Sequence, residues 1–113
     1  LRLTHRMKRS NRLLVSSFDR RLLDVVRPSG FSTALISRTR ALRSVREAVS
    51  LGCAAWHPLH TLVAPRTVAY AHAAGLRVHA WTVDDPLLAR RLIRLGVQGI
   101  FTNDPSRLRG LTR

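Results

Sequence analysis

The stretch that decides the fold is RVHAWTVDDP at residues 77–86, continued by GVQGIFTNDP at residues 96–105. The first segment favours a strand through its β-branched and aromatic residues. Asp84, Asp85 and Pro86 then stop that strand and open a helix, because Asp is a good N-cap and Pro fits a first helical turn. Gly96 ends the helix, and a second strand follows at once. A strand, a helix and a strand joined by such short connections predict a parallel βαβ unit.

The same alternation extends back through the chain. The expected strands start near residues 13, 32, 53, 77 and 98, which is a regular repeat of about twenty residues. The expected helices are capped or opened by Asp19, by Pro65 and by the Asp85–Pro86 pair, with a further helix at residues 40–51 and a short last one at residues 106–111. The third strand is expected at residues 53–56 and to be weak, with residues 57–60 as a turn or loop.

Two architectures fit five such units, an open doubly wound sheet and part of a (βα)8 barrel. The chain contains neither a G-x-G-x-x-G fingerprint nor a Walker A motif, which disfavours a nucleotide-binding open sheet. A complete barrel needs about 250 residues. The 113 residues of this chain would therefore make somewhat more than half of one, and a first residue other than Met indicates a fragment or a processed product.

Composition is typical of one globular domain, with 45% hydrophobic and 23% charged residues. We expect a basic N-terminal segment at residues 1–12 and the domain at residues 13–113. No apolar run approaches the roughly 20 residues of a membrane span, and no signal peptide is visible, so a cytoplasmic location is expected. The single Cys53 excludes an internal disulfide and is expected to be a buried, inert thiol.

The formal net charge is +14, and Lys8 is the only lysine among twenty basic residues. Such an excess of arginine is compatible with binding to nucleic acid or another anionic surface. The simpler interpretation is that the arginines solvate the outer faces of the helices. Arg90, Arg91 and Arg94 fall between the apolar positions of their helix, as that interpretation requires.

Several motifs follow one another in the order known from one family. WTVDDP at residues 81–86 and LGVQGIFTNDP at residues 95–105 closely resemble the closing signature of the glycerophosphodiester phosphodiesterases, W-T-V-N-[DE] and then G-V-D-G-I-[IF]-T-[DN]-x-P. AHAAGL at residues 71–76 and VSSFD at residues 15–19 resemble the A-H-x-x-G-L and S-S-F-[ND] segments of that family. The resemblance implies an α/β fold, the C-terminal portion (about five βα units) of a TIM (βα)8 barrel of the phospholipase C-like phosphodiesterase type.

The resemblance also shows what this chain lacks. Asp84 and Gln98 replace the usual Asn and Asp, which are small departures. The catalytic segments of the family, H-R-G, P-E-N-T, I-E-x-D, H-D and E-x-K, do not occur, and His5-Arg6 is followed by Met7. The family implies a divalent cation (Ca or Mg) held by carboxylates, with two His as acid and base. We therefore expect no catalytic residue, no metal ligand and no cofactor in this chain itself.

What the chain contributes is expected to be part of the substrate pocket. Active-site residues of barrels stand at the carboxyl ends of the strands, where Trp81 and Phe18 both fall. The resemblance implies that Trp81 lies beside the glycerol moiety, and we predict Trp81 and Phe18 as substrate-binding residues. Ser17, Thr102 and Asn103 also fall at strand ends, but turn capping explains them as well or better.

The histidines are weaker candidates. His57 and His60 form an H-x-x-H, but a metal site needs further ligands nearby, so His57 is interpreted as a loop residue or a phosphate donor at the pocket rim. His79 shares strand parity with Trp81 and should face the same side, as a core or pocket residue. His72 is expected on a helix surface.

Two functional hypotheses remain open, beside the possibility that the chain is a degenerate gene product without a function. The first is a fragment of a glycerophosphodiester phosphodiesterase, which would cleave a glycerophosphodiester to glycerol 3-phosphate and an alcohol and would be inactive alone. The second is a non-enzymatic module that binds anions or nucleic acid through its arginines. One continuous arginine stripe favours the second hypothesis, whereas arginines spread over the outer helices favour the first.

Overall fold

The computed structural model describes residues 13–111, so the basic segment expected at residues 1–12 lies outside the described residues. The strands of this part are β1 (Leu14–Ser17), β2 (Ser32–Ser37), β3 (Ala55–Pro58), β4 (Arg77–Ala80) and β5 (Gly99–Ile100). The α-helices are α2 (Arg20–Val26), α3 (Ala41–Ser50), α4 (Pro65–Ala73) and α5 (Pro86–Arg94). Three 3-10 turns complete the elements, η1 (Arg27–Ser29), η2 (His60–Leu62) and η3 (Pro105–Leu108).

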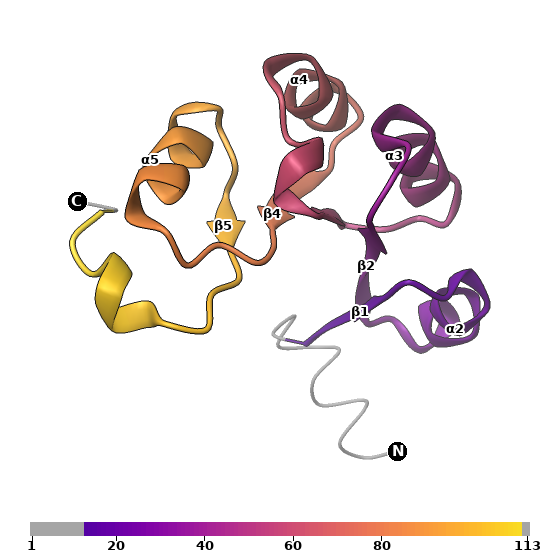
Figure 1. Ribbon diagram of the computed structural model, residues 1–113. Coiled ribbons are helices and arrows are strands. Elements are labelled where there is room, and N and C mark those ends of the chain that lie inside the picture. Colours follow the sequence, from indigo (N-terminus) through magenta and orange to yellow (C-terminus); the bar gives the residue numbers. More distant parts are fainter. Residues whose placement is uncertain (1–12, 112–113) are drawn as a thin grey trace.

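The five strands form one parallel sheet in the order of the sequence, β1-β2-β3-β4-β5. The sheet is curved, and all four α-helices lie outside the curve, so that the inner face of the strands carries no helix (Figure 1). Each crossover helix thus packs on the same side, which is the arrangement of consecutive units in a barrel rather than of a doubly wound sheet with helices on both faces.

The core lies between the outer face of the sheet and the helices. Trp56 of β3 is fully buried at its centre, and its register partners Leu35 and Val78 lie on the same face. The helices contribute the buried side chains Leu23, Val45, Ala48, Val68, Ala71, Ala89 and Leu92 to this cluster. Burial of each large apolar side chain contributes about 1.5–3 kcal/mol, so this layer supplies the main stabilisation of the fold.

The expected helix signals are confirmed in detail. The Asp19 carboxylate accepts a hydrogen bond from the Arg21 N–H at 2.9 Å, and the Asp85 carboxylate accepts one from the Leu88 N–H at 3.2 Å. Gly96 has a φ of +98°, the left-handed conformation that a glycine adopts without strain when it ends a helix. These caps set the direction in which α2 and α5 leave the strand ends.

Several strand boundaries differ from those expected. The third strand is Ala55–Pro58 rather than residues 53–56, and all four of its residues are buried, so the expectation of a weak strand followed by a loop was wrong. β4 ends at Ala80, and Trp81 continues the pairing only as an isolated parallel bridge to Leu59. β5 comprises only two residues, although Val83 N–H and Phe101 C=O still pair at 2.9 Å beyond the strand ends.

Candidate functional site

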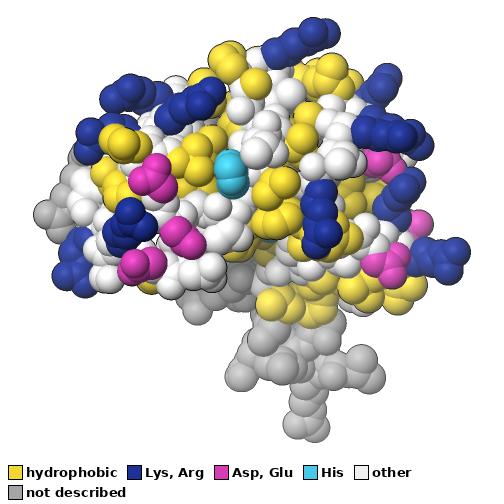
Figure 2. All heavy atoms as spheres, in the orientation of Figure 1, with side chains coloured by type: hydrophobic (Ala, Val, Ile, Leu, Met, Phe, Trp, Pro, Cys, Tyr) yellow, Lys and Arg dark blue, Asp and Glu magenta, His cyan; other side chains and the backbone are white. Residues whose placement is uncertain are grey.

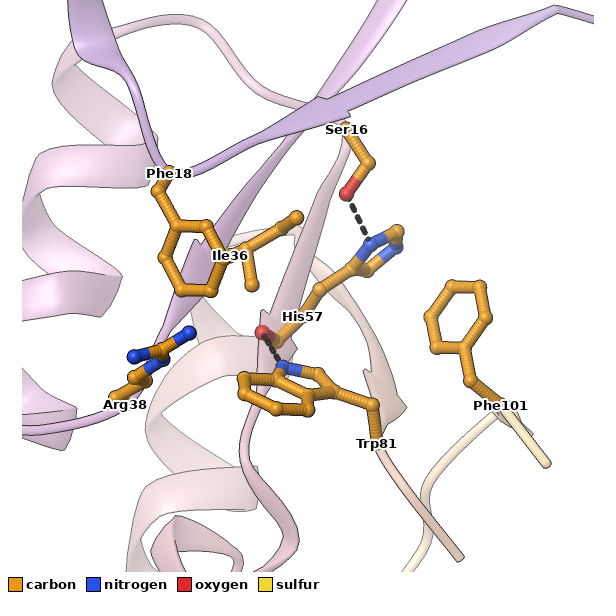
Figure 3. A pocket seen from close by; sticks show the side chains of 7 residues that line it. All are labelled: Ser16, Phe18, Ile36, Arg38, His57, Trp81 and Phe101. Atoms are coloured by element: carbon orange, nitrogen blue, oxygen red, sulfur yellow. Dashed lines mark hydrogen bonds between the residues drawn. The ribbon is translucent and has the colours of Figure 1, made fainter. Parts of the chain in front are cut away.

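A cavity of about 360 Å³ lies on the inner face of the sheet, at the carboxyl ends of the strands. Every strand contributes to it from its last residues or from the residues that follow. Its lining residues are Ser16, Phe18, Ile36, Arg38, His57, Trp81 and Phe101 (Figure 3). The parallel register explains why residues of all five strands meet here, because parallel strands end at the same edge of the sheet and alternate residues of a strand face the same side.

Phe18 and Trp81, the two residues predicted to bind substrate, lie together in this cavity. Their ring centroids are 6.0 Å apart and the rings are perpendicular, an edge-to-face contact. The Trp81 indole N–H donates a hydrogen bond to the carbonyl oxygen of His57 at 2.9 Å, which fixes the orientation of the indole. The pair therefore forms an oriented aromatic wall across β1 and β4, strands that are not neighbours in the sheet.

Arg38 lies on the same side of the cavity as Phe18 (Figure 3). Its guanidinium carbon is 4.8 Å from the centroid of the Phe18 ring and lies over the ring face, which is a cation–π contact. This side chain follows β2 directly and is exposed, so a positive charge stands at the mouth of an otherwise largely apolar cavity.

A chain of three polar side chains crosses the other side of the cavity. The Ser16 Oγ lies 2.7 Å from Nδ1 of His57, and Nε2 of His57 lies 2.9 Å from Nδ1 of His79. The residues come from β1, β3 and β4, and His57 is 1% exposed. Since both ring nitrogens of His57 are engaged, its side chain has a single well-defined orientation.

Burial lowers the pKa of both imidazoles. The pKa of His57 falls to about 4, first because burial disfavours the charged ring and second because His79 is nearby. Burial is also the main cause of the lowered pKa of His79, with a further contribution from Arg77. Both rings are thus neutral at pH 7, and their contact is one N–H donating to one ring nitrogen.

The remaining polar residues at strand ends serve the turns, as expected. Ser17 Oγ accepts a hydrogen bond from the Asp19 N–H at 2.9 Å. Thr102 donates its hydroxyl to Asp84 at 2.8 Å, and the Asn103 N–H donates to the same Asp84 oxygen at 2.8 Å. These hydrogen bonds, the backbone one first, lower the pKa of Asp84. None of these residues lines the cavity described above.

The interpretation of His57 as a loop residue was wrong. His57 lies within β3 and lines the cavity, because the strand extends through Pro58 instead of ending before it. His60 lies in η2, three residues further along, and does not line the cavity. His79 faces the inner side as predicted, and His72 is exposed on α4, where it bonds the Gln98 side chain.

Four of the lining residues were not singled out by the sequence reasoning, namely Ser16, Ile36, Arg38 and Phe101. Only their positions could have indicated them. Each lies within one or two residues of a strand end, at one of the alternate positions whose side chains face the inner side of the sheet.

Cys53 is partly buried rather than buried, and burial raises the pKa of its thiol. That shift keeps the thiol protonated and unreactive at neutral pH.

The described residues do not fit a metal centre. No group of three or more His, Cys, Asp or Glu side chains within residues 13–111 is placed to hold an ion. His57 and His79 face each other, but their facing ring nitrogens are engaged in a hydrogen bond with one another.

No helix of the described part is long and apolar enough to cross a membrane.

Comparisons with known proteins place this geometry in a family. The sequence model described as "Glycerophosphoryl diester phosphodiesterase family" matches residues 2–107. A glycerophosphodiester phosphodiesterase of Caldanaerobacter subterraneus is 28% identical over 104 residues, which cover 90% of this chain and 43% of the relative. Another relative, the Arabidopsis thaliana glycerophosphodiester phosphodiesterase GDPD4, is 38% identical over 52 residues, which are 46% of this chain and 16% of that protein.

Solved structures show the same fold. A glycerophosphodiester phosphodiesterase from Thermotoga maritima has a TM-score of 0.75 at 21% identity, over 99% of this chain and 52% of that one. An Oleispira antarctica phosphodiesterase, solved with the product sn-glycerol-3-phosphate, has a TM-score of 0.78 at 24% identity, over 88% of this chain and 41% of that one.

These matches agree on the fold of the chain and on how much of the family's full length it spans. The five parallel strands with their outer helices are a part of a TIM barrel, and the prediction of that fold class is confirmed. The chain spans less than half the length of the curated relatives that it matches. With the family model covering nearly all of its residues, the chain belongs to the glycerophosphoryl diester phosphodiesterase family.

Proposed function

We propose that this chain forms the C-terminal wall of the substrate pocket of a glycerophosphodiester phosphodiesterase. In the whole protein, hydrolysis would release glycerol 3-phosphate and an alcohol. The observation that carries the proposal is the cavity at the carboxyl ends of the strands, in which Phe18 and Trp81 form a single wall. That edge is where barrel enzymes bind substrate, and both residues lie within the part of the chain that the family model matches.

The catalytic groups are proposed to lie outside this chain. The sequence has none of the H-R-G, P-E-N-T or E-x-K segments, and residues 13–111 offer no ligand set for a cation. We therefore assign the divalent cation, Ca or Mg, and the acid and base to the remainder of the barrel. The 113 residues alone are expected to be inactive, because they supply binding surface and no group placed for the chemistry.

The placement of the arginines supports the enzyme hypothesis over a nucleic-acid-binding module. On the face seen in Figure 2, the Arg side chains of the described residues are scattered around the outer helices, with apolar, uncharged and acidic surface between them. Arg90, Arg91 and Arg94 of α5 are exposed, as the solvating role requires. A nucleic-acid interface favours one continuous basic stripe that follows a phosphate backbone.

The test begins with the coding sequence upstream of Leu1. H-R-G, P-E-N-T and E-x-K segments, within roughly the 120 to 150 residues that complete a barrel, are expected in the same frame. The product of that frame should then hydrolyse glycerophosphocholine or glycerophosphoglycerol in the presence of Ca²⁺ or Mg²⁺. An unrelated upstream sequence, or a purified product that hydrolyses no glycerophosphodiester, would overturn the proposal.

A further inference from the structure

Ser16 is the residue of the cavity whose hydrogen-bonding capacity is only partly used. A serine hydroxyl has one proton to donate and two lone pairs with which to accept. The contact with Nδ1 of His57, at 2.7 Å, uses one of these positions. Whichever of the two groups is the donor, at least one lone pair of the Ser16 Oγ stays free. The side chain is exposed and lines the cavity, so that lone pair is open to a ligand.

The other polar side chains of the lining have no acceptor left. Both ring nitrogens of His57 are engaged, one with Ser16 and the other with His79. The Trp81 indole N–H donates to the carbonyl oxygen of His57. An indole and a guanidinium, such as that of Arg38, have donors and no acceptor. Among the described side chains that line the cavity, the Ser16 hydroxyl is therefore the group that can accept a hydrogen bond from a ligand.

The residues behind Ser16 fix the place of its hydroxyl. His57 is buried, and its ring makes an edge contact with Phe101, with 4.9 Å between the ring centroids. The far side of the same ring is held by His79, with 2.9 Å between Nε2 of His57 and Nδ1 of His79. A hydroxyl that is held before the ligand arrives has little freedom left to lose on binding, which favours affinity.

The cavity combines this acceptor with an apolar wall. Phe18 and Trp81 offer ring surface to a carbon chain, and Figure 3 shows the Ser16 hydroxyl on the side of the cavity away from Phe18. The glycerol moiety of a glycerophosphodiester has three carbons and two free hydroxyls, each with a proton to donate. When such a group leaves water, each hydroxyl needs a new partner, because an unpaired polar group is costly.

We propose that Ser16 accepts a hydrogen bond from one of the two hydroxyls of the glycerol moiety, and so makes the pocket select glycerol over alcohols that lack this hydroxyl. Trp81 contacts the carbon chain of the same moiety. This inference rests on the proposed function and adds to it a residue that determines specificity for glycerol.

The experiment compares three phosphate monoesters on one preparation of the full product of the reading frame. Glycerol 3-phosphate is the product of the proposed reaction, 3-hydroxypropyl phosphate lacks its central hydroxyl, and 2-hydroxypropyl phosphate lacks its terminal one. Dissociation constants are measured by calorimetry in the presence of Ca²⁺ or Mg²⁺, and none of the three has a diester bond to hydrolyse. Because all three meet the same protein, a change in the folded fraction leaves the ratios of their affinities unchanged.

Glycerol 3-phosphate should bind about three- to tenfold more tightly than the analogue that lacks the bonded hydroxyl, which is the range of one neutral hydrogen bond. Ser16→Ala should remove this preference by weakening glycerol 3-phosphate alone, because the analogue has no such bond to lose. Ser16→Thr keeps a hydroxyl and should keep the preference. Ser17→Ala is the matched control, because the Ser17 hydroxyl accepts from the Asp19 N–H and does not line the cavity.

The outcomes separate the two proposals. If the three ligands bind equally well, or the preference is the same in Ser16→Ala, Ser16 does not select glycerol, while the proposed function stands. If Ser17→Ala changes the preference as much as Ser16→Ala, the effect belongs to β1 as a whole and the assignment to Ser16 is overturned. If glycerol 3-phosphate does not bind at all, the proposed function fails and this inference with it.

Discussion

Nε2 of His57 lies 2.9 Å from Nδ1 of His79, and the two rings join neighbouring strands on the inner face of the sheet. With the contact between Ser16 and His57, they link β1, β3 and β4 in one hydrogen-bonded chain. Both imidazoles have a lowered pKa because they are buried, so the contact depends on neutral rings. The stability of the domain is therefore coupled to pH through this pair.

We expect the free energy of unfolding to decrease as the pH falls from 6.5 to about 4. His57 has an ordinary pKa of 6.5 when unfolded and of about 4 when folded, so in this window only the unfolded chain binds the proton. Above pH 6.5 the neutral His57 makes its full contribution to the free energy of unfolding, and roughly 3 kcal/mol of that contribution is lost by pH 4. Urea unfolding followed by circular dichroism at pH 7, 5.5 and 4 measures it.

A variant and its control test whether His57 is the residue that makes the free energy of unfolding depend on pH. His57→Gln removes the titrating group and should flatten this part of the pH dependence, whatever its effect on the stability at pH 7. His72→Gln alters an exposed histidine on α4 and should leave the slope unchanged. A slope that survives in His57→Gln would show that another group binds the proton.

The buried indole of Trp56 provides a test of the core. Trp56 is fully buried, and its N–H donates a hydrogen bond to Ser37 Oγ at 3.1 Å. Ser37→Ala leaves this buried N–H without a partner and should reduce the free energy of unfolding by about 1–3 kcal/mol. Ser50→Ala, an exposed change at the end of α3, should be nearly neutral by the same urea measurement. Equal effects of the two changes would contradict the assigned role of the hydrogen bond.

A substitution at Gly99 tests the packing of the histidine rings on the inner face of the sheet without a change of charge. A methyl group at Gly99 would lie 3.0 Å from Cδ2 of His79, tighter than most Cβ contacts, so the imidazole would have to give by a few tenths of an ångström while its hydrogen bond to His57 holds it in place. Gly99→Ala should reduce stability by about 1–3 kcal/mol, as overpacking does. It should also shift the ring-proton NMR signals of His79 and His57, whereas those of His72 stay in place.

The alternation of elements was predictable because its signals are local. Asp19, Asp85 and Gly96 act within one turn of the helix ends that they define, so their residue types alone indicated the boundaries. The third strand was misplaced because Pro58 is usually a turn residue. Here Pro58 stays in the strand and its carbonyl oxygen accepts from the Trp81 N–H at 3.1 Å, a contact with a residue 23 positions away.

The site was predictable only where a motif marked it. Trp81 and Phe18 lie in segments with a recognisable pattern, and the structure brings them together. Ser16 and His57 are 41 positions apart in the sequence, and their contact depends on the register of two intervening pairs of strands. Arg38 was one arginine among many, and only its place over Phe18 distinguishes it from those that solvate helices.

Trp81 and Phe18 should prove to be binding residues when the whole protein is assayed with glycerophosphoglycerol. Trp81→Ala and Phe18→Ala each remove one apolar contact with the substrate and should raise KM about tenfold, with a smaller effect on kcat. Trp81→Phe keeps a ring but loses the hydrogen bond to the His57 carbonyl, so its KM should be intermediate. Leu87→Ala is the matched control, because Leu87 is an apolar residue that is 73% exposed on α5. An unchanged KM in both alanine variants would exclude these rings from the substrate pocket, and a loss confined to kcat would instead indicate a role in the chemical step.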